Sequence, residues 1–421
     1  MSDRRVVLIA AVGVLALTAG IGLFALQEGG SADRRVADER FARAHAAGYT
    51  GAGVSVGIVD VTGFDADATG VADQVVATRA FGGGESVTSG GEDEHGTAAA
   101  RVVARAVPGA NLSLATADSP SGYRAAVEWL LDRDVDVIVA PVGFYGKPGD
   151  GTAAVERLAT RAARQGVVFV APAGNTAESH WVGRYDEVRN GRLVFGDRTR
   201  NFLQNGGRRV SLWLSRTEAG PEGVIANYTL ALYRLDESGS ELVARSQPYR
   251  HDDAPNERID VTVPEGTYFV TVEGPAEPTG ERLELVSQTH ELQRARGGGS
   301  LVAPGTARGV LTVGAFDRER GRVRPYSSRG PTADGRIGID VVAPDTGVAD
   351  VPDGFTGSSA AVPYAGATAA LVRAANPDLG PAAVEGVLER TATEVDGSPF
   401  AAGDGRVDPW AAVQAARNAS G

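Results

Sequence analysis

Two apolar runs that each end in a polar residue constrain the fold of this chain most. Residues 54–59 read Val-Ser-Val-Gly-Ile-Val and are followed by Asp60, and the run that starts at Val167 ends in Asn175. Short apolar runs of this kind are typical of strands buried in a parallel sheet. Open α/β sheets bind ligands at the carboxyl ends of such strands. Asp60 and Asn175 are therefore candidate site residues, with a loop cap and a turn asparagine as the alternatives.

Two further candidates lie where helices are predicted to begin. His95 is followed by Gly-Thr and an alanine-rich stretch whose apolar positions are near helical spacing. Ser359 opens a small-residue helix with Pro363 in its first turns, and a helix N-terminus offers free N–H groups to an anion. Taken singly, the histidine could be a structural or surface residue and the serine an N-cap. Ser358 competes with Ser359 as a nucleophile.

These four residues together supply the groups that acyl transfer by a serine needs. Asp60 would orient the general base His95, Ser359 would attack, and Asn175 would donate a hydrogen bond to the oxyanion. The sequence has no His-Glu-x-x-His and no paired Cys/His spacing, which argues against a zinc site. No Gly-x-Ser-x-Gly surrounds Ser359, which argues against another class of acyl hydrolase.

The same motifs resemble those of the subtilases, the subtilisin-like serine peptidases. The order Asp, His, Ser is that of subtilisin itself. Gly357-Ser-Ser-Ala-Ala-Val-Pro363 is similar to the family's Gly-Thr-Ser-Met-Ala-x-Pro, whose nucleophile stands four residues before the proline, which is Ser359 here. The resemblance covers roughly residues 50–184 and 299–415. It implies a three-layer α/β fold with a mostly parallel central sheet, and a serine endopeptidase that needs no cofactor for its chemistry.

By this resemblance, two segments flank the primary specificity pocket. The predicted substrate-binding residues in them are Pro141, Val142, Gly143, Ala173 and Gly174. The family's Ser-Leu-Gly appears here as Pro-Val-Gly, and a proline has no N–H to bond the substrate backbone. The glycines suggest an open, largely apolar pocket. Subtilases often bind calcium, so a structural calcium ion is left open, and the acidic loop 65–73 is a candidate that could also be merely solvated.

Residues 185–298 differ in character from the regions around them. Alternating apolar and polar positions separated by turn residues predict an all-β sandwich inserted into the α/β fold. Substrate or surface binding and simple stabilisation are both open as its role. The predicted domains are an anchor or signal segment at 1–27, a stalk at 28–49, a catalytic domain at 50–184 and 299–421, and this insert. The alternative function is a non-catalytic surface binding protein on a degenerate protease scaffold.

The net charge and the N-terminal segment limit the possible partners of this protein and its possible location in the cell. The formal net charge of −12 argues against nucleic acid as a partner, so proteins or peptides are the expected substrates. Residues 6–26 carry no charge and are long enough to span a bilayer. We therefore expect a single-pass membrane protein with its catalytic domain outside the cytoplasm, with a cleaved signal and secretion as the alternative. Residues 27–49 are too few for a folding propeptide domain, so we expect maturation without one.

Overall fold

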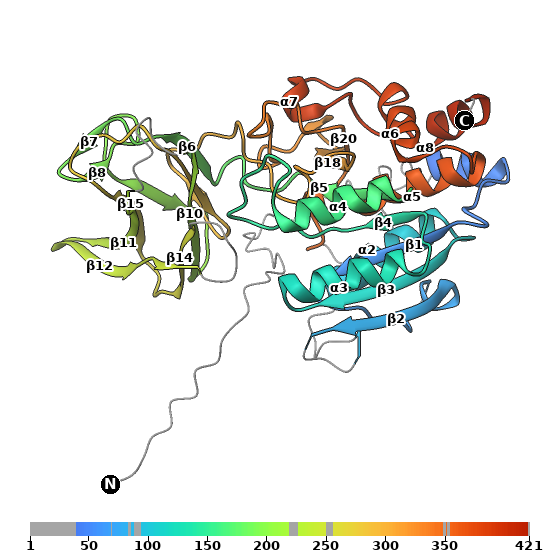
Figure 1. The fold of residues 1–421 in the computed structure, drawn as a ribbon, viewed down its shortest axis with the longest axis horizontal. Coiled ribbons are helices and arrows are strands. Elements are labelled where there is room, and N and C mark those ends of the chain that lie inside the picture. The colour runs from blue at the N-terminus through green and yellow to red at the C-terminus, as the bar shows by residue number, and fades with distance from the viewer. Residues whose placement is uncertain are drawn as a thin grey trace, which may run out of the picture.

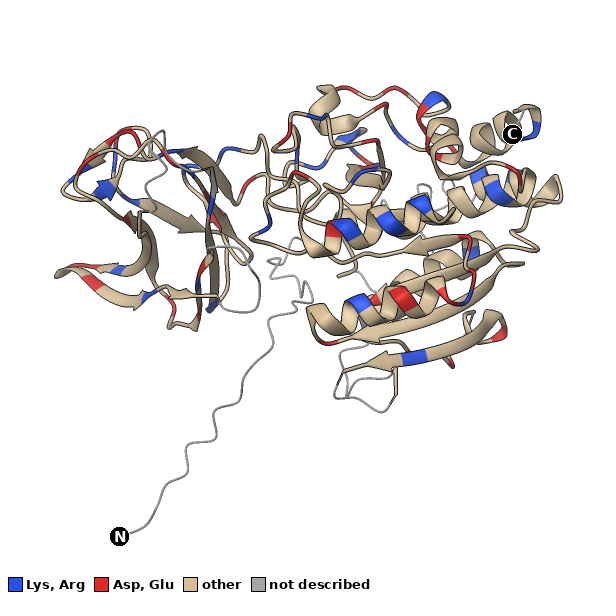
Figure 2. Cartoon of the chain, viewed as in Figure 1, with Lys and Arg blue, Asp and Glu red and all other residues tan. Residues whose placement is uncertain are grey.

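The computed structural model describes residues 39–68, 70–82, 86–87, 94–218, 226–249, 256–347, 351 and 354–419. Two units lie side by side in this part of the chain, one with helices around a sheet and one built of strands (Figure 1). The strand-only unit spans residues 180–292 and is called the β unit, and the rest is called the α/β unit. Acidic and basic residues are spread over both units (Figure 2).

An eight-stranded sheet forms the centre of the α/β unit. Its order is β19-β18-β5-β4-β1-β3-β2, with β20 paired to β18, and all neighbours are parallel except β18 and β19. The strands are β1 (Ser55–Asp60), β2 (Val75–Phe81), β3 (Asn111–Ala117), β4 (Val137–Val139), β5 (Val168–Pro172), β18 (Leu311–Asp317), β19 (Arg322–Val323) and β20 (Val341–Pro344). Every residue of β4, β5 and β18 is buried, as expected for strands with covered faces.

Helices cover both faces of this sheet. One apolar core joins the strands to α2 (Glu94–Ala106), α5 (Ser358–Ala375), α6 (Pro381–Arg390) and α8 (Pro409–Asn418), and the other joins them to α3 (Pro120–Leu131) and α4 (Ala154–Arg164). Because side chains alternate along a strand, Ile58 packs into the first core and Val59 into the second. The short elements are η1 (Ala72–Gln74) and α7 (Pro399–Ala402). The result is the expected three-layer α/β arrangement with a mostly parallel sheet.

The β unit consists of two antiparallel sheets that share one apolar core. The orders are β13-β14-β10-β16-β6 and β12-β11-β15-β8-β7, and β9 pairs with β15 and β17. The strands are β6 (His180–Arg184), β7 (Val188–Arg189), β8 (Arg192–Leu193), β9 (Asn201–Gln204), β10 (Arg209–Glu218), β11 (Thr229–Asp236), β12 (Gly239–Arg245), β13 (Gln247–Pro248), β14 (Asn256–Thr262), β15 (Thr267–Glu273), β16 (Arg282–Ser287) and β17 (Glu291–Leu292). Leu212 and Leu285 from the first sheet meet Leu230 and Val270 from the second in the shared core. The first strand of the β unit, β6, begins at His180, which is before residue 185, where the inserted domain was predicted to begin.

The predicted fold class also contained a transmembrane helix over residues 6–26, a segment that lies outside the described residues. Among the helices that the structure describes, none combines the length and the apolar character needed to cross a membrane. The longest, α5, has 18 residues, mostly alanine and other small side chains that are buried inside the α/β unit. The fold class is therefore corrected to an α/β unit with a β unit and without a membrane-spanning helix in the part of the chain that is described.

Candidate active site

The carboxylate of Asp60 is held rigidly at the end of β1. Its side chain is fully buried, and Oδ1 accepts hydrogen bonds from the Thr62 backbone N–H at 2.8 Å and from the Thr62 hydroxyl at 2.7 Å. The Thr62 hydroxyl in turn accepts the N–H of Gly96 at 3.0 Å. A side chain at position 96 would place its Cβ only 2.1 Å from the Gly63 carbonyl oxygen, so only glycine lets α2 start this close to the strand end.

His95, the second residue of α2, connects Asp60 to Ser359. Its Nδ1 lies 2.7 Å from Asp60 Oδ2, and its Nε2 lies 3.2 Å from Ser359 Oγ. The ring of Phe355 meets the imidazole edge to face, with 5.1 Å between ring centroids. The Asp60 carboxylate fixes the tautomer with a proton on Nδ1, which leaves the Nε2 lone pair directed at the serine hydroxyl.

The charges of Asp60 and His95 shift each other's pKa in the direction opposite to the shift that burial causes. Desolvation alone would raise the pKa of Asp60, but the charge and hydrogen bond of His95 and the bonds from Thr62 hold that pKa below its usual value. Desolvation alone would lower the pKa of His95, but the Asp60 carboxylate raises it above its usual value. The imidazole therefore retains its proton to a higher pH than a free histidine does, and it becomes an acceptor only above that pH.

The two adjacent serines at the start of α5 face different partners. The Ser358 hydroxyl accepts the backbone N–H of Gly174 at 3.1 Å, and the Ser358 N–H donates to Asn175 Oδ1 at 2.8 Å. Ser358 therefore ties the helix to the end of β5. Only the Ser359 hydroxyl faces His95, in agreement with the spacing to Pro363 in the sequence.

Asn175 has its amide oriented by that contact. Since Oδ1 is bonded to the Ser358 N–H, Nδ2 is directed toward Gly357, and no partner for Nδ2 is found among the described residues. A Cβ at position 357 would lie 2.5 Å from Nδ2, and the φ of 96° there also favours glycine. The amide N–H₂ thus remains a donor without a partner in the described chain, beside Ser359.

The predicted substrate-binding residues lie in two segments, 141–143 and 173–174. Val302 and Ala303 hydrogen-bond to the backbone in or next to both segments. The Val302 N–H donates to the Ala173 carbonyl at 2.9 Å, and the Phe144 N–H donates to the Ala303 carbonyl at 2.7 Å. A Cβ on Gly143 would lie 2.8 Å from a Val302 methyl, and a Cβ on Gly174 would lie 2.9 Å from the other one.

This contact changes the expected pocket. The Val302 side chain fills the space beside both glycines, where the sequence suggested an open pocket, and Val302 itself is buried. Val142 and Ala173 are also buried, each in an apolar cluster of the α/β unit. Sequence reasoning missed Val302 because more than a hundred residues, including the β unit, separate it from both segments.

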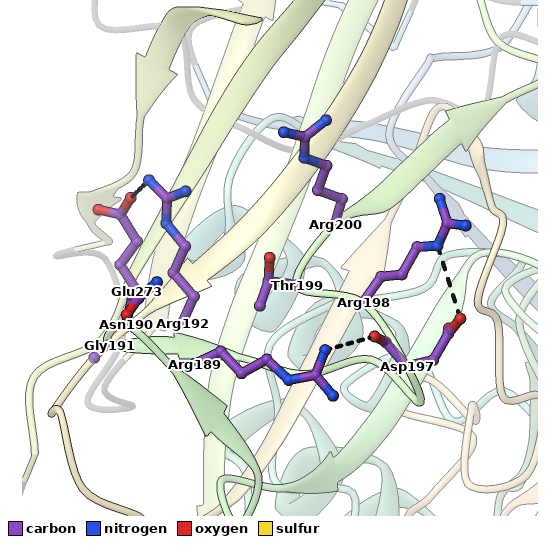
Figure 3. Close-up of a pocket in the computed structure, with 10 residues that line it drawn as sticks. Arg189, Asn190, Gly191, Arg192, Asp197, Arg198, Thr199, Arg200 and Glu273 are labelled. Atoms are coloured by element: carbon purple, nitrogen blue, oxygen red, sulfur yellow. Dashed lines mark hydrogen bonds and ion pairs between the residues drawn. The ribbon is translucent and has the colours of Figure 1, made fainter.

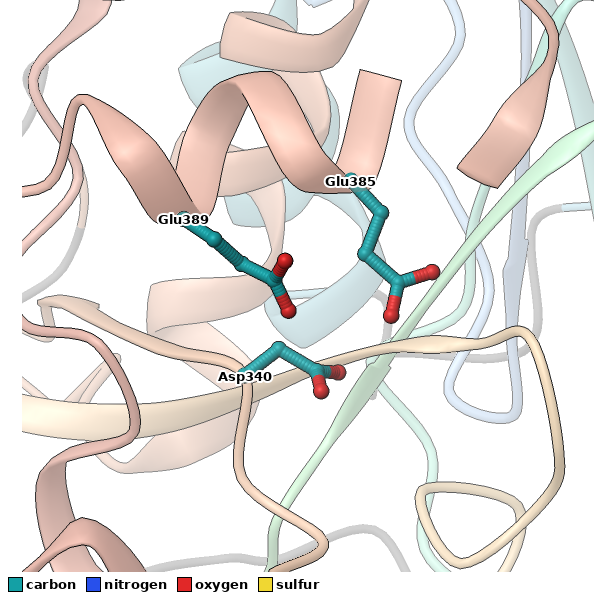
Figure 4. A group of neighbouring side chains, drawn as sticks. All are labelled: Asp340, Glu385 and Glu389. Atoms are coloured by element: carbon teal, nitrogen blue, oxygen red, sulfur yellow. The ribbon is translucent and has the colours of Figure 1, made fainter. Parts of the chain in front are cut away.

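A cluster of three carboxylates lies away from these residues, where α6 meets the chain before β20. Asp340, Glu385 and Glu389 are the only described residues whose side chains gather closely enough to hold a metal ion, and the acidic loop 65–73 forms no such group in its described part (Figure 4). Desolvation and neighbouring negative charge raise the pKa of Asp340 to about 7 and that of Glu385 to about 8. The same causes raise the pKa of Glu389.

The cluster should make stability depend on pH. The folded pKa values of Asp340 and Glu385 are raised, so the folded protein holds protons that the unfolded chain has released, and stability falls as pH rises from about 4 to about 8. Glu385→Gln should therefore stabilise the protein relative to wild type by on the order of 1–3 kcal/mol more at pH 9 than at pH 5. Urea unfolding of both proteins at the two pH values measures this difference. An equal pH dependence of the two proteins would contradict it.

Comparison with known proteins finds sequences that are similar to this chain. Residues 280–405 match the model of the Subtilase family. Subtilisin DY of Bacillus licheniformis is 34% identical over 167 residues, which cover 35% of this chain and 58% of that protein. The chain thus spans little more than half the length of this relative. The matched family segment includes Ser359 but not Asp60 or His95.

Solved structures resemble the described fold. The CspB protease of Clostridium perfringens superposes with a TM-score of 0.62 at 16% identity, over 88% of this chain and 94% of that one. A protease of Pseudoalteromonas arctica has a TM-score of 0.49 at 16% identity, over 89% of this chain and 93% of that one. At this identity the first likeness shows the fold. Together with the family match, it confirms the resemblance to the subtilases.

Proposed function

We propose that this chain, which resembles the subtilases in sequence and in fold, is a serine endopeptidase that hydrolyses peptide bonds in proteins or peptides. The observation that carries the proposal is the continuous line of contacts from Asp60 through His95 to Ser359. The available amide of Asn175 beside that serine supports it further.

The proposed mechanism uses side chains and backbone groups alone. Ser359 Oγ attacks the peptide carbonyl carbon while His95 Nε2 takes the hydroxyl proton, and Asp60 stabilises the imidazolium that forms. Asn175 Nδ2 and the Ser359 backbone N–H, in the first turn of α5 where N–H groups lack helical partners, bind the oxyanion. His95 then gives its proton to the leaving amine, and water repeats the sequence on the acyl-enzyme.

A fluorophosphonate probe tests this function directly, because it reacts only with an activated serine. We expect stoichiometric labelling of the folded chain, with the adduct on the peptide that contains Ser359, and loss of labelling when a peptide substrate competes. A chain that folds but takes up no probe and cleaves no peptide would favour the alternative, a non-catalytic binding protein on this scaffold.

We further propose that the enzyme acts outside the cytoplasm. The support is the uncharged stretch 6–26 behind Arg4 and Arg5, a pattern that suits an export signal. Cell fractionation with N-terminal sequencing of the active protein tests this. Activity confined to the cytoplasm would contradict it.

Asn175→Ala should lower kcat by about 10²–10³, the effect of removing the corresponding donor in subtilisin, with little change in KM. The amide would be lost from the developing oxyanion, whereas ground-state binding of substrate does not depend on it. Steady-state kinetics on a chromogenic peptide measures the change. Asn418→Ala, at an exposed residue of α8, is the matched control, and an unchanged kcat for Asn175→Ala would remove this residue from the mechanism.

Val302 should restrict the residue on the acyl side of the cleaved bond to small side chains. Val302→Gly removes the methyls that fill the space beside Gly143 and Gly174. We expect kcat/KM for a peptide with Phe at that position, relative to one with Ala, to rise by roughly 10–200-fold. Val302→Ala should lie between the two proteins. An unchanged Phe/Ala ratio in both variants would place the specificity pocket elsewhere.

A further inference from the structure

A pocket of about 800 Å³ opens on the β unit (Figure 3), and Ser359 is not among the residues that line it. The β7–β8 hairpin, the loop at 197–200 and the end of β15 line it, and every lining residue is polar or glycine. The absence of any apolar side chain from this lining distinguishes it from the usual pocket for a drug-like or peptide ligand, which is mostly apolar.

The side chains around this pocket carry excess positive charge. Arg189, Arg192, Arg198 and Arg200 line it together with only two carboxylates, Asp197 and Glu273. Both carboxylates are already paired, Asp197 with Arg294 at 2.5 Å and Glu273 with Arg245 and with Arg192 at 3.0 Å. Arg189 pairs with Glu187 at 3.2 Å, so Arg198 and Arg200 supply most of the surplus. The basic surplus reverses the sign of a chain whose net charge is −12, so the pocket is a local site of attraction for anions.

Two of the guanidinium groups are held in place by aromatic rings. Arg192 lies 5.5 Å from the centroid of Tyr233, the Tyr233 ring stacks on Phe269 at 5.2 Å and 7°, and Arg200 lies 4.8 Å from the centroid of Phe269. This row of cation, two rings and cation fixes the two charges relative to each other. Fixed donors bind an anion without first losing conformational freedom.

Several donors of the pocket are unused. Arg200 makes no ion pair within the described residues, and the hydroxyl of Thr199 and the amide of Asn190 have no hydrogen-bond partner there. Arg198 approaches Asp197 only at 3.7 Å, beyond hydrogen-bond distance. An anion in the pocket would find a guanidinium, a hydroxyl and an amide available to donate to it.

The β7–β8 hairpin places like charges directly opposite each other. Arg189 pairs with Arg192 across the two-residue turn Asn190-Gly191, and both turn residues have positive φ. Each of these arginines is also paired with a carboxylate, Arg189 with Glu187 at 3.2 Å and Arg192 with Glu273 at 3.0 Å, which offsets the repulsion between them. An anion bound beside the hairpin would be attracted by both guanidinium groups at once.

We propose that this pocket binds an anionic saccharide through its carboxylate, sulfate or phosphate group. The guanidinium groups take the acidic group, and the polar lining suits the hydroxyls of the sugar. The volume exceeds what a lone inorganic anion would fill, and the lining has no aromatic or aliphatic anchor of the kind that dominates peptide binding. The inference concerns the β unit and holds whether or not Ser359 is a nucleophile.

Calorimetry on the full chain tests the proposal with defined probes. The anionic saccharides are a sulfated tetrasaccharide, an oligogalacturonate of the same length and a sugar phosphate, which carry sulfate, carboxylate and phosphate groups. The control ligands are neutral maltotetraose, polyglutamate and inorganic phosphate. We expect at least one anionic saccharide to bind, with affinity that falls as salt is raised, and Arg200→Gln and Arg189→Gln each to weaken it at least tenfold. Arg124→Gln, on α3 of the other unit, is the control and should leave binding unchanged.

Thermal unfolding gives a second, independent readout. The anionic saccharide should raise the Tm of wild type more than that of Arg189→Gln, because the variant has lost one of the guanidinium donors of the pocket. Peptide hydrolysis should be equal in all these proteins. Equal binding of maltotetraose, tighter binding of polyglutamate, or binding of inorganic phosphate without any gain from the sugar would each overturn the proposal.

Discussion

Ser359→Ala is expected to lower peptide hydrolysis by about 10⁴ or more while the protein remains folded. The alanine removes the only hydroxyl that faces His95 Nε2, so no nucleophile remains to form the acyl-enzyme. The methyl group fits the space of the serine, and no other hydrogen bond of this hydroxyl is found among the described residues. Active-site titration and steady-state kinetics measure the loss of hydrolysis. Thermal unfolding of the same preparation measures whether the variant remains folded.

Ser358→Ala is the matched control for that change. The Ser358 hydroxyl accepts the Gly174 N–H, so its loss should cost on the order of 1 kcal/mol of stability and reduce activity only modestly. Both variants remove one hydroxyl from the same turn of α5, and they differ only in the partner that is lost. An inactive Ser358→Ala beside an active Ser359→Ala would show that the register of the nucleophile is wrong.

Asp60→Asn should lower kcat by about 10⁴ without unfolding the protein. The Asn oxygen can still accept the Thr62 N–H, which turns the amide N–H₂ toward His95 Nδ1. An Nδ1 that accepts a hydrogen bond forces the imidazole proton onto Nε2, and Nε2 then cannot take the proton of Ser359. Asp150→Asn, at a partly exposed carboxylate of the same unit, is the control and should retain full activity.

The pH profile separates this role of Asp60 from a purely structural one. Because Asp60 raises the pKa of His95, wild-type kcat/KM should fall as pH drops through a value above about 6.5. The residual activity of Asp60→Asn should persist to lower pH, since the charge that held the proton on the imidazole is gone. An acid limb at the same pH in both proteins would mean that another group controls it.

Local patterns in the sequence predicted the elements that carry the candidate site. The apolar runs at 54–59 and from 167 onward are buried strands, because a strand covered on both faces has no need of alternating polar residues. Asp60 ends one of these strands, Asn175 follows the other, and His95 and Ser359 stand in the first turns of helices. Each assignment depends on neighbours only a few residues away, so a single sequence contains enough information to make it.

Tertiary packing alone decided what lies between these elements. The contact of Val302 with Gly143 and Gly174, the cluster of Asp340 with two glutamates, and the row of rings between Arg192 and Arg200 join residues that are far apart in the chain. Such contacts have no periodicity in the sequence, because they arise where separate strands, helices and loops meet. The sequence therefore determined which residues could perform acyl transfer. Packing within the α/β unit determined the distances between these residues and the filling of the space beside Gly143 and Gly174, and packing within the β unit determined the proposed site for an anion.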